Sequence, residues 1–459
     1  MSTDQPTSSP SSDAFSEDTE LRRDLGAVTA TTMIIGSIIG SGIFAGPSVV
    51  ARYTDSSGLT LVVWLICSLM SFCGAVSYAE LGGMMPRAGG VFVYLKEAYG
   101  ALWAFLFGWN AMLVVRPADI AAIAIVFSTY LGFFISPYPE WALKGVALCT
   151  VIILGFINYF GIRFGGLVQN LSTFLKVGGL CVLVVFALTM TSDATQFDPV
   201  WPSLSADVDI IGYISLISLA MVAAFGAYDG WDASTYVAEE IKNPRRLVPL
   251  SIILGLAITT VVYLLVNFAY LYVLSNTGVA QSGRVASETM VQLIGPVGGA
   301  FISVTVMIST FGTINAGLMA GPRICYAMAR QRVFFSWVAR VHPVYKTPSN
   351  AILLMTIAAA MYIMFLGSWE TIIASRTAAL WLFYISNTFS IFMFRRTHPD
   401  APRPYRTWGY PVTPAIFVLI GVSFFISIVI SDPSHALLGL LITALGIPVY
   451  RFWMSKQER

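Results

Sequence analysis

The sequence predicts an all-α integral membrane protein with about twelve transmembrane helices. Hydrophobic residues make up 56% of its 459 residues and charged residues only 11%, whereas soluble domains carry about 25% charged residues. Apolar runs of about 20 residues, the length that crosses a hydrocarbon core, recur along the whole chain. Two of these runs are interrupted by glycines and polar residues, which sets them apart from the others.

The apolar runs fall into two groups of five and a final pair. We expect spans at residues 26–50, 58–83, 101–134, 143–160, 166–191, 209–238, 248–275, 294–328, 349–367, 371–394, 412–431 and 435–454. They form one membrane domain in residues 21–455, with helices 1–5 at about 26–191, helices 6–10 at about 209–394 and helices 11 and 12 at about 412–454.

Three further segments are not spans. Residues 1–20 are rich in Ser, Thr, Asp, Glu and Pro, which predicts a disordered tail. This tail lacks the basic flank and apolar core of a signal peptide. Residues 85–100 are mixed in character and predict a short interfacial helix or re-entrant turn, and residues 283–293 predict a small helix outside the membrane.

Lysine and arginine collect in the loops on the side of the N-terminal tail. The opposite loops carry only Arg52, Lys144, Arg284 and Arg376. Because short positively charged loops stay in the cytoplasm, we expect a multi-pass protein of the plasma membrane with both termini cytoplasmic. The even number of spans agrees, since it brings both chain ends to one side.

No pattern typical of an enzyme or of ATP-driven transport is found. The five cysteines all lie in apolar runs, without metal-ligand spacing. The three histidines lie at the ends of different spans, and no glycine loop of the phosphate-binding kind occurs. We therefore expect no enzymatic activity, no metal, no cofactor and no nucleic-acid partner. The composition indicates the lipid bilayer as a partner.

Residues 33–47 are the first interrupted run. Gly40, Ser41 and Gly42 lie at its middle, and Gly46-Pro47 follow. Glycine weakens a helix interior by about 1 kcal/mol relative to alanine, so we expect the helix to open here. Opened backbone in hydrocarbon must be satisfied by protein, water or a ligand, and the start of the second half-helix suits a carboxylate. The alternative is a small-residue packing face between helices.

The sixth span repeats this feature. Gly226, Asp229, Gly230 and Asp232 interrupt an otherwise apolar run. Spans 1 and 6 occupy corresponding places in the two groups of five. Paired interrupted helices at corresponding positions indicate a transporter built from inverted repeats, with its binding site at the two breaks.

Both interruptions carry longer motifs, Gly36-Ser-Ile-Ile-Gly-Ser-Gly-Ile-Phe44 in the first run, and Tyr228-Asp-Gly-Trp231 followed by Glu239-Glu-Ile-Lys-Asn-Pro244 in the sixth. Arg116-Pro117, Lys176 and Phe311-Gly-Thr-Ile-Asn315 accompany them. These motifs resemble the L-type amino acid transporter family of the amino acid–polyamine–organocation superfamily. The resemblance extends from about residue 21 to 455.

The resemblance implies two inverted five-helix repeats plus two extra helices, helices 1 and 6 unwound at mid-membrane, and alternating access to an amino acid. In the family the substrate carboxylate binds amides of the helix 1 break, and the α-amino group binds carbonyls of helices 1 and 6. We therefore place the substrate at Ser37, Ile38, Ile39, Gly40, Ser41, Gly42, Phe225, Gly226, Ala227, Asp229 and Gly230.

The chain departs from the family in two places. Heterodimeric members carry a cysteine in the external loop between helices 3 and 4, bonded to a glycoprotein subunit. That loop reads Ser136-Pro-Tyr-Pro-Glu-Trp141 here, so we expect no disulfide-linked heavy subunit and a stand-alone, prokaryotic-type transporter. Family members often carry a bulky gating side chain at the position two residues before Tyr228, and this position is Gly226 here. The usual aromatic lid is therefore not expected at this position.

Charged residues inside spans need partners or a cavity. Asp229 could bind the side chain or the ammonium of the substrate, or it could cap the N-terminus of a half-helix. For Asp232 we expect either a helix-capping hydrogen bond or an ion pair inside the protein. Arg116 and Asp119 share a helix face, which indicates a structural pair, with a gate contact as the alternative.

Lys176 lies about ten residues into its span. By resemblance it replaces a bound sodium ion and links helices 1, 5 and 8; the alternatives are a proton carrier and a snorkelling lysine. Thr313 and Asn315 either line the site from helix 8 or join helices. Trp381 either closes the cavity or packs.

The combined interpretation is a secondary amino acid transporter, a sodium-independent exchanger of neutral amino acids, with cationic amino acids as a further candidate class of substrate. Two alternatives stay open at this stage. The first is a proton- or sodium-coupled symporter, since Lys176 replaces one sodium site without excluding coupling elsewhere. The second is a receptor that binds amino acids without transporting them, although the chain shows no signalling domain.

Overall fold

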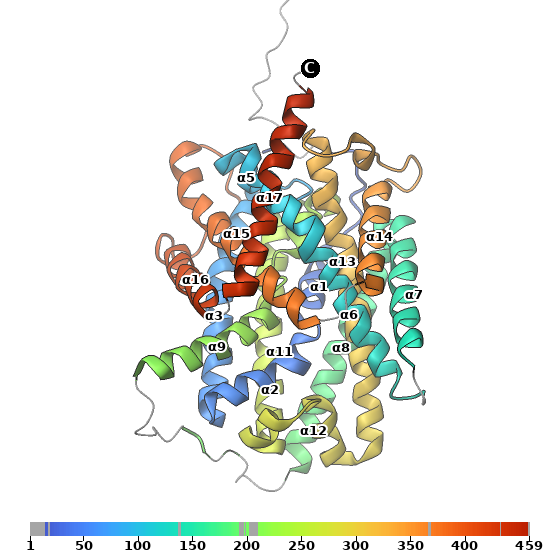
Figure 1. Cartoon of the computed structure of the whole chain (residues 1–459), viewed down its shortest axis with the longest axis vertical. Helices are drawn as coiled ribbons and strands as arrows, with labels where there is room; N and C mark the ends of the chain where they lie inside the picture. The colour runs from blue at the N-terminus through green and yellow to red at the C-terminus, as the bar shows by residue number, and fades with distance from the viewer. Residues whose placement is uncertain are drawn as a thin grey trace, which may run out of the picture.

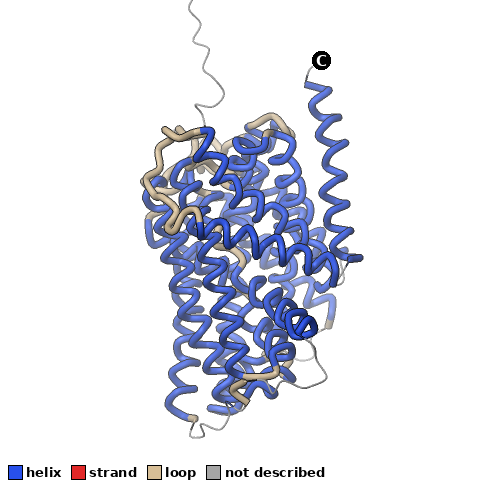
Figure 2. The backbone as a smooth tube through the Cα atoms, turned by 90° about the vertical axis from the view of Figure 1, so that its left-hand side faces the viewer, coloured by secondary structure: helices blue, strands red, loops and turns tan. Residues whose placement is uncertain are grey.

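The computed structural model describes residues 14–16, 19–135, 139–191, 197, 199–201, 210–365, 369–431 and 433–457. Within these residues nearly all regular structure is helical, and the extended pairing is a single bridge between Leu25 and Ile241. The helices pack side by side along the long axis of the molecule, with loops at both ends (Figures 1 and 2). The predicted all-α membrane fold is confirmed.

The first half of the chain forms spans 1 to 5. Its helices are α1 (Ala27–Ile38), α2 (Gly42–Thr54), α3 (Ser57–Met84), α4 (Val91–Tyr99), α5 (Ala101–Asn110), α6 (Arg116–Leu131), α7 (Glu140–Tyr159) and α8 (Ile162–Met190). A π-helical turn, Ala111–Val115, joins α5 to α6 within one span. Such turns often occur at functional sites, and this one ends directly before Arg116.

The second half forms spans 6 to 10 and the final pair. Its elements are α9 (Ile210–Tyr228), α10 (Ala233–Tyr236), the 3₁₀ turn Ala238–Glu240, α11 (Pro244–Gln281), α12 (Val285–Ile294), α13 (Pro296–Arg330), the 3₁₀ turn Ser336–Ala339, α14 (Ser349–Phe365), α15 (Trp369–Thr397), α16 (Val412–Ser431) and α17 (Pro433–Gln457). α11 is bent at Ser275, which has φ 65° and ψ 168°.

Each expected span coincides with a helix or with a broken pair of helices. In the described residues, eight helices are long and apolar enough to cross a membrane, and α1 with α2 makes a ninth span. α14 and the end of α9 are shorter apolar helices. The mixed segment 85–100 contains α4, and the polar segment 283–293 contains α12, so both predicted short helices are present.

The outer surface of the bundle is apolar because lipid covers it. Leu171 and Phe174 of α8, for example, are 60% and 62% exposed, while Lys176 of the same helix is completely buried. In water such a surface would cost free energy in proportion to its apolar area. The polar groups therefore concentrate inside the bundle, where the candidate site lies.

Both described ends of the chain lie at the same end of the bundle. Trp453 of α17 donates its indole N–H to the carbonyl of Arg332, which follows α13. Thr19 bonds Glu239, and Glu239 also binds Arg330 at the end of α13. We call this end, at the top of Figure 1, the termini side; α2 and α12 lie toward the other end. Of the predicted tail, Ala14 to Ser16, Thr19 and Glu20 are described.

Candidate functional site

The first break separates α1 from α2 at residues 39–41. The two half-helices meet at an angle of 40°, and Ile39 leaves helical geometry with φ −75° and ψ 77°. The last carbonyls of α1 have no amide within the helix to bond. They need other partners because this part of the chain is buried in the bundle.

Lys176 supplies those partners from α8. Its ammonium donates to the carbonyls of Ile39 at 2.7 Å and Gly36 at 3.2 Å, and to the carbonyl of Ser309 on α13 at 2.9 Å. The hydroxyls of Ser309 and Thr313 each donate to one of the same α1 carbonyls at 3.0 Å. Lys176 therefore links α1, α8 and α13, and being fully buried it does not reach an interface as a snorkelling lysine would.

The start of α2 presents amide groups without intrahelical partners. The N–H groups of Gly42 and Ile43 belong to the first turn, where no preceding helical carbonyl is available. The helix dipole adds positive partial charge at this point. Ser37, Ser41 and Gly42 are partly exposed, and Ala45 is exposed. An anionic group such as a carboxylate therefore fits here.

The second break lies between α9 and α10 and touches the first. Gly230 has φ +117°, a backbone conformation that side chains disfavour. A Cβ atom at Gly230 would lie 3.0 Å from Ser37 Cβ, and one at Gly42 would lie 2.7 Å from Ala227 Cα. The absence of side chains on these two glycines thus allows the two breaks to meet.

A tyrosine on α11 joins the two breaks directly. The hydroxyl oxygen of Tyr263 lies 2.8 Å from the carbonyl oxygen of Ile38 and 3.1 Å from that of Ala227. A hydroxyl has one hydrogen, so it donates to one carbonyl at a time or is shared between them. Tyr263 is completely buried, and it fixes one carbonyl of each broken helix relative to the other.

The two aspartates of the second break have different partners. Asp229, partly exposed, accepts a short hydrogen bond from the hydroxyl of Tyr384 on α15. Asp232 is buried, accepts a hydrogen bond from Tyr236 at 2.6 Å and lies 3.8 Å from Arg116. Asp232 is the residue before α10, yet its side chain makes no capping bond to that helix. Arg116 therefore forms an ion pair with Asp232 of the second break. The sequence spacing between Arg116 and Asp119 did not indicate this partner.

Trp381 is part of an aromatic cluster beside the second break. Its ring centroid lies 5.3 Å from that of Phe225 and 4.7 Å from that of Phe424 on α16, and only 4% of Trp381 is exposed. Gly226 follows Phe225 and is exposed, with open space where a Cβ would be. The aromatic surface near the breaks is therefore formed by Phe225 and Trp381, while position 226 leaves a gap.

Thr313 and Asn315 of α13 have separate roles. Thr313 lies at the first break, where its Cγ2 would be 3.3 Å from a Cβ at Gly40. Asn315 is fully buried and donates to Gly165 at 2.9 Å and to Gln169 at 3.0 Å, both on α8. Asn158 of α7 donates to its oxygen at 2.9 Å. Asn315 thus joins α7, α8 and α13, so we leave it out of the proposed site.

Between the breaks and the termini side, ion pairs bind the helices together. Arg323 of α13 forms two hydrogen bonds with Glu240, at 2.7 and 3.0 Å, and both side chains are fully buried. Glu239 lies 3.2 Å from Arg330 and 3.7 Å from Arg87.

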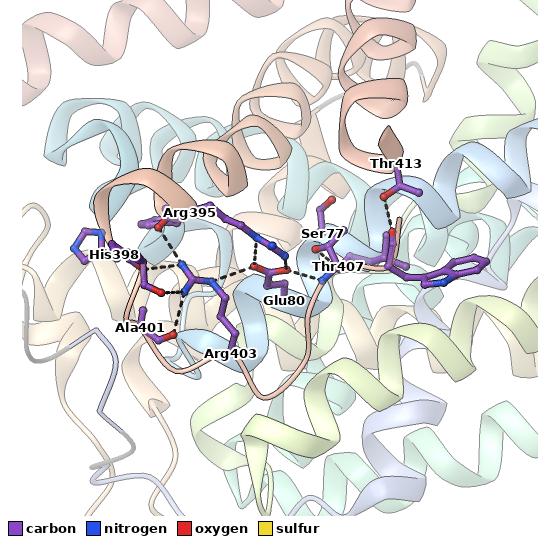
Figure 3. A network of polar contacts seen from close by, with 12 residues as sticks. Ser77, Glu80, Arg395, His398, Ala401, Arg403, Thr407 and Thr413 are labelled. Carbon is purple, nitrogen blue, oxygen red and sulfur yellow. Dashed lines mark hydrogen bonds and ion pairs between the residues drawn. The ribbon is translucent and has the colours of Figure 1, made fainter. Parts of the chain in front are cut away.

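A third carboxylate, Glu80 at the end of α3, binds Arg395, Arg403 and the amide of Thr407, as Figure 3 shows. The Glu80 side chain is 1% exposed. The guanidinium of Arg395, at the end of α15, lies 2.7 Å from the Glu80 carboxylate. Thr407 belongs to the loop between α15 and α16. Together with the pairs of Glu239 and Glu240, this network joins α3 to α15, and α13 to the chain that follows the second break.

A separate apolar groove lies on the outer surface between α6, α8 and α13. It has a volume of about 560 Å³, and its lining is apolar apart from Ser172: Phe127, Phe134, Val168, Leu171, Leu175, Val304, Met307, Ile308 and Phe311. A zwitterion would lose its hydration there without replacement. The polar site at the two breaks therefore fits an amino acid, and this groove does not.

Sequence reasoning placed the two breaks and Lys176 but missed Tyr263, Ser309 and Tyr384. These are hydroxyl residues within otherwise apolar spans, and such residues also join helices without touching a ligand. Only the three-dimensional contact with the released carbonyls or with Asp229 distinguishes them. Among the described residues, no group of His, Cys, Asp and Glu is arranged to hold a metal ion.

Two broken helices that meet inside a closed helical bundle, each with released backbone groups, define a secondary membrane transporter. The profile of the amino acid permease family matches residues 25–447, and the chain belongs to that family.

Similarity to individual proteins extends over nearly the whole chain. The serine/threonine exchanger SteT of Bacillus subtilis (strain 168) is 33% identical over 96% of this chain and 99% of its own. The human b(0,+)-type amino acid transporter 1 is 31% identical over 91% of this chain and 84% of its own. The rabbit (Oryctolagus cuniculus) large neutral amino acids transporter small subunit 2 is 31% identical over 95% and 82%. The resemblance to L-type transporters is confirmed.

Proposed function

We propose that the protein exchanges amino acids across the plasma membrane by alternating access, without sodium. The carboxylate of the substrate binds the amides at the start of α2, between Ser41 and Ile43, and the α-ammonium binds carbonyl oxygens of the two breaks. The family membership and the names of the relatives, which include an exchanger, support this function. The contact between the two breaks supports the position of the substrate.

The observation that carries sodium independence is the surroundings of Lys176. Carbonyls released at broken helices are the groups that coordinate sodium in related transporter folds. Here the carbonyls of Gly36, Ile39 and Ser309 already bind an ammonium that is part of the protein. The Lys176 ammonium supplies at this position the positive charge that a bound sodium ion would supply, and it occupies the carbonyls that a sodium ion would need.

The substrate range follows from the second break. No atom lies within 4 Å of the position that a Cβ would occupy at Gly226, and open space beside the proposed substrate position favours large side chains. Asp229 is partly exposed beside this space, and a carboxylate there attracts a cationic side chain. We therefore propose neutral amino acids as substrates, with cationic ones accepted beside them.

We further propose that the termini side is cytoplasmic, since its loops carry most of the lysines and arginines. All five cysteines lie in membrane helices, namely Cys67 and Cys73 in α3, Cys149 in α7, Cys181 in α8 and Cys325 in α13. This placement favours a transporter without a disulfide-linked heavy subunit. Residues 136–138 of the external loop lie outside the described part of the chain.

The test is uptake of radiolabelled amino acids into proteoliposomes that contain the purified protein. We expect uptake only into liposomes preloaded with unlabelled amino acid, and the same rate when choline replaces sodium at constant pH. Uptake into empty liposomes that follows a sodium or proton gradient would identify a symporter instead. Binding without any uptake would identify a receptor, and either result would overturn the proposed exchange.

A further inference from the structure

The described part of the N-terminal segment, residues 14–16 and 19–25, lies against the termini side of the bundle. Ala14, Leu21 and Leu25 are buried, with exposed fractions of 7%, 5% and 1%. The ring of Phe15 lies 5.5 Å from that of His398, which follows α15. Buried apolar side chains and specific ring contacts mark a docked segment rather than a chain that only passes by.

Hydrogen bonds join this segment to the ion pairs of the termini side. Thr19 donates its hydroxyl to Glu239 at 2.8 Å, and the same carboxylate binds Arg330 of α13. Arg245, in the first turn of α11, donates to the carbonyl of Phe15 at 2.9 Å. The segment thus contacts elements that belong to different parts of the bundle.

The segment also ties the two broken helices together. The amide of Leu25 donates to the carbonyl of Glu240 at 3.0 Å, and the amide of Lys242 donates to the carbonyl of Leu25 at 2.8 Å. α1 begins two residues after Leu25, and Glu240 ends the turn that follows α10. Any movement of α1 away from the ion pairs on this side must therefore displace the segment or break these bonds.

A polar cavity lies beneath Ala14. It has a volume of about 260 Å³ and is lined by Ala14, Arg87, Lys96, Glu239, Ala327 and Arg330, among others. This space is enough for several water molecules, each of which takes about 30 Å³ in the liquid. Because Ala14 forms part of the wall, the docked segment covers part of this cavity.

We propose that residues 14–16 and 19–25 hold the termini side closed, and that they leave this surface when the transporter opens to that side. In the docked state the segment holds Glu239 between Arg330 and Thr19 and covers part of the cavity beside the ion pairs. When it leaves, Glu239 loses one donor and α1 is free to separate from α13. The occupant of this surface is the chain itself, which makes the rate of inward opening depend on the N-terminal segment.

The test measures access to the cavity rather than transport, so it stays valid if the proposed amino acid exchange is wrong. Ala327, on the cavity wall and 4% exposed, is replaced by cysteine in a protein whose five native cysteines are replaced by alanine. A membrane-impermeant maleimide is then applied to the termini side of vesicles. We expect labelling to be at least several times faster when Phe15→Ala and Thr19→Val are added, because each removes one contact of the docked segment.

Arg22→Gln is the matched control. Arg22 lies in the same segment, its side chain is 62% exposed, and it pairs with the nearby Asp24, so its labelling rate should equal that of the parent. Removal of residues 2–18 provides a second variant that needs no new side chain to pack, and it should also accelerate labelling. Unchanged labelling in both the double variant and the truncation, with the protein monodisperse in detergent, would overturn the proposal.

Discussion

Two glycines determine how closely the broken helices approach each other. Gly42 at the start of α2 faces Ala227 at a distance that leaves no room for a Cβ, and Gly230 in the second break combines a tight contact with Ser37 with a φ of +117°. Because the substrate backbone is proposed to bind where these helices meet, added bulk at this point acts on function before it acts on the fold.

Gly42→Val tests this point. Its Cβ would lie 2.7 Å from Ala227 Cα and 2.8 Å from Ala227 Cβ, so the two breaks must separate. We expect loss of amino acid uptake in a protein that still inserts and elutes as a single species. Gly178→Val is the control, because Gly178 is exposed on α8 with nothing near its Cβ position. Uptake kinetics of Gly42→Val equal to those of Gly178→Val would refute the assignment.

Tyr263→Phe tests the bond between the breaks. The variant keeps the ring contacts with Trp64 and Tyr228 but removes the hydroxyl at the carbonyls of Ile38 and Ala227. One hydrogen bond contributes about 0.5–1.5 kcal/mol, so we expect the half-saturation concentration of uptake to rise by up to about tenfold. Tyr270→Phe is the control, since Tyr270 is equally buried on α11 and its hydroxyl has no partner in the described structure. Equal kinetics in the two variants would remove Tyr263 from the site.

Asp229 and Gly226 determine side-chain selectivity in the proposed function. Competition by alanine, leucine, phenylalanine, arginine and glutamate measures it. We expect arginine to compete in the parent and much less in Asp229→Asn, which loses the negative charge but keeps a group that can accept a bond from Tyr384. Gly226→Phe should exclude large substrates, because open space surrounds its Cβ position. If arginine never competes, Asp229 does not read the side chain, and neutral exchange remains.

At the scale of helices, the break in the first span is stable because α8 and α13 satisfy its released carbonyls. The carbonyls of Gly36 and Ile39 together receive the Lys176 ammonium and two hydroxyl groups. Hydrogen bonds to charged groups contribute about 1.5–3 kcal/mol each. Lys176 therefore determines the geometry of the break more than the stability of the bundle, which has many other contacts.

Lys176→Ala should consequently reduce uptake by at least about tenfold in a protein that still inserts and elutes as a single species, because the hydroxyls of Ser309 and Thr313 still donate to the carbonyls of Ile39 and Gly36. Uptake by the parent should not require sodium. Lys144→Ala serves as the control because Lys144 forms an exposed pair with Glu140 within one helix, and such pairs contribute about 0.3–0.5 kcal/mol. A variant that transports normally, or one that fails to fold, would contradict this role of Lys176.

The sequence was sufficient to predict the helices and the two breaks. Apolar length gave every span, and glycines next to polar residues gave both interruptions, because these signals are local. Partners were not predictable in the same way. Arg116 has Asp119 three residues away, yet its ion pair reaches Asp232 of the second break. Asn315 proved to join helices because of residues on α7 and α8. Such pairings depend on how distant helices pack.

At the scale of the whole molecule, buried ion pairs join the helices near the termini side. Arg323 and Glu240 form one such pair, with no exposed side-chain surface. A buried charge without its partner costs about 3–5 kcal/mol, whereas replacing both partners by apolar residues is often neutral. The pair therefore contributes a specific arrangement of α13 against the second broken helix.

Glu240→Leu alone should lower the unfolding temperature strongly, because Arg323 then remains charged and buried. The double variant Glu240→Leu/Arg323→Met should recover most of that loss. Thermal unfolding of the detergent-solubilised parent, both single variants and the double variant measures the coupling between the two residues. Additive losses in the double variant would show that the pair does not act as a unit.

The most direct measurement is an experimental structure with a transported amino acid bound, using the one that competes best for uptake. We expect its carboxylate to lie about 3 Å from the amide nitrogens of Gly42 and Ile43, a hydrogen-bond distance, with its ammonium toward the carbonyls of the second break. We also expect the Lys176 ammonium, and no sodium ion, at the carbonyls of Gly36 and Ile39. Amino acid density elsewhere, for example in the groove between α6, α8 and α13, would contradict the proposed site.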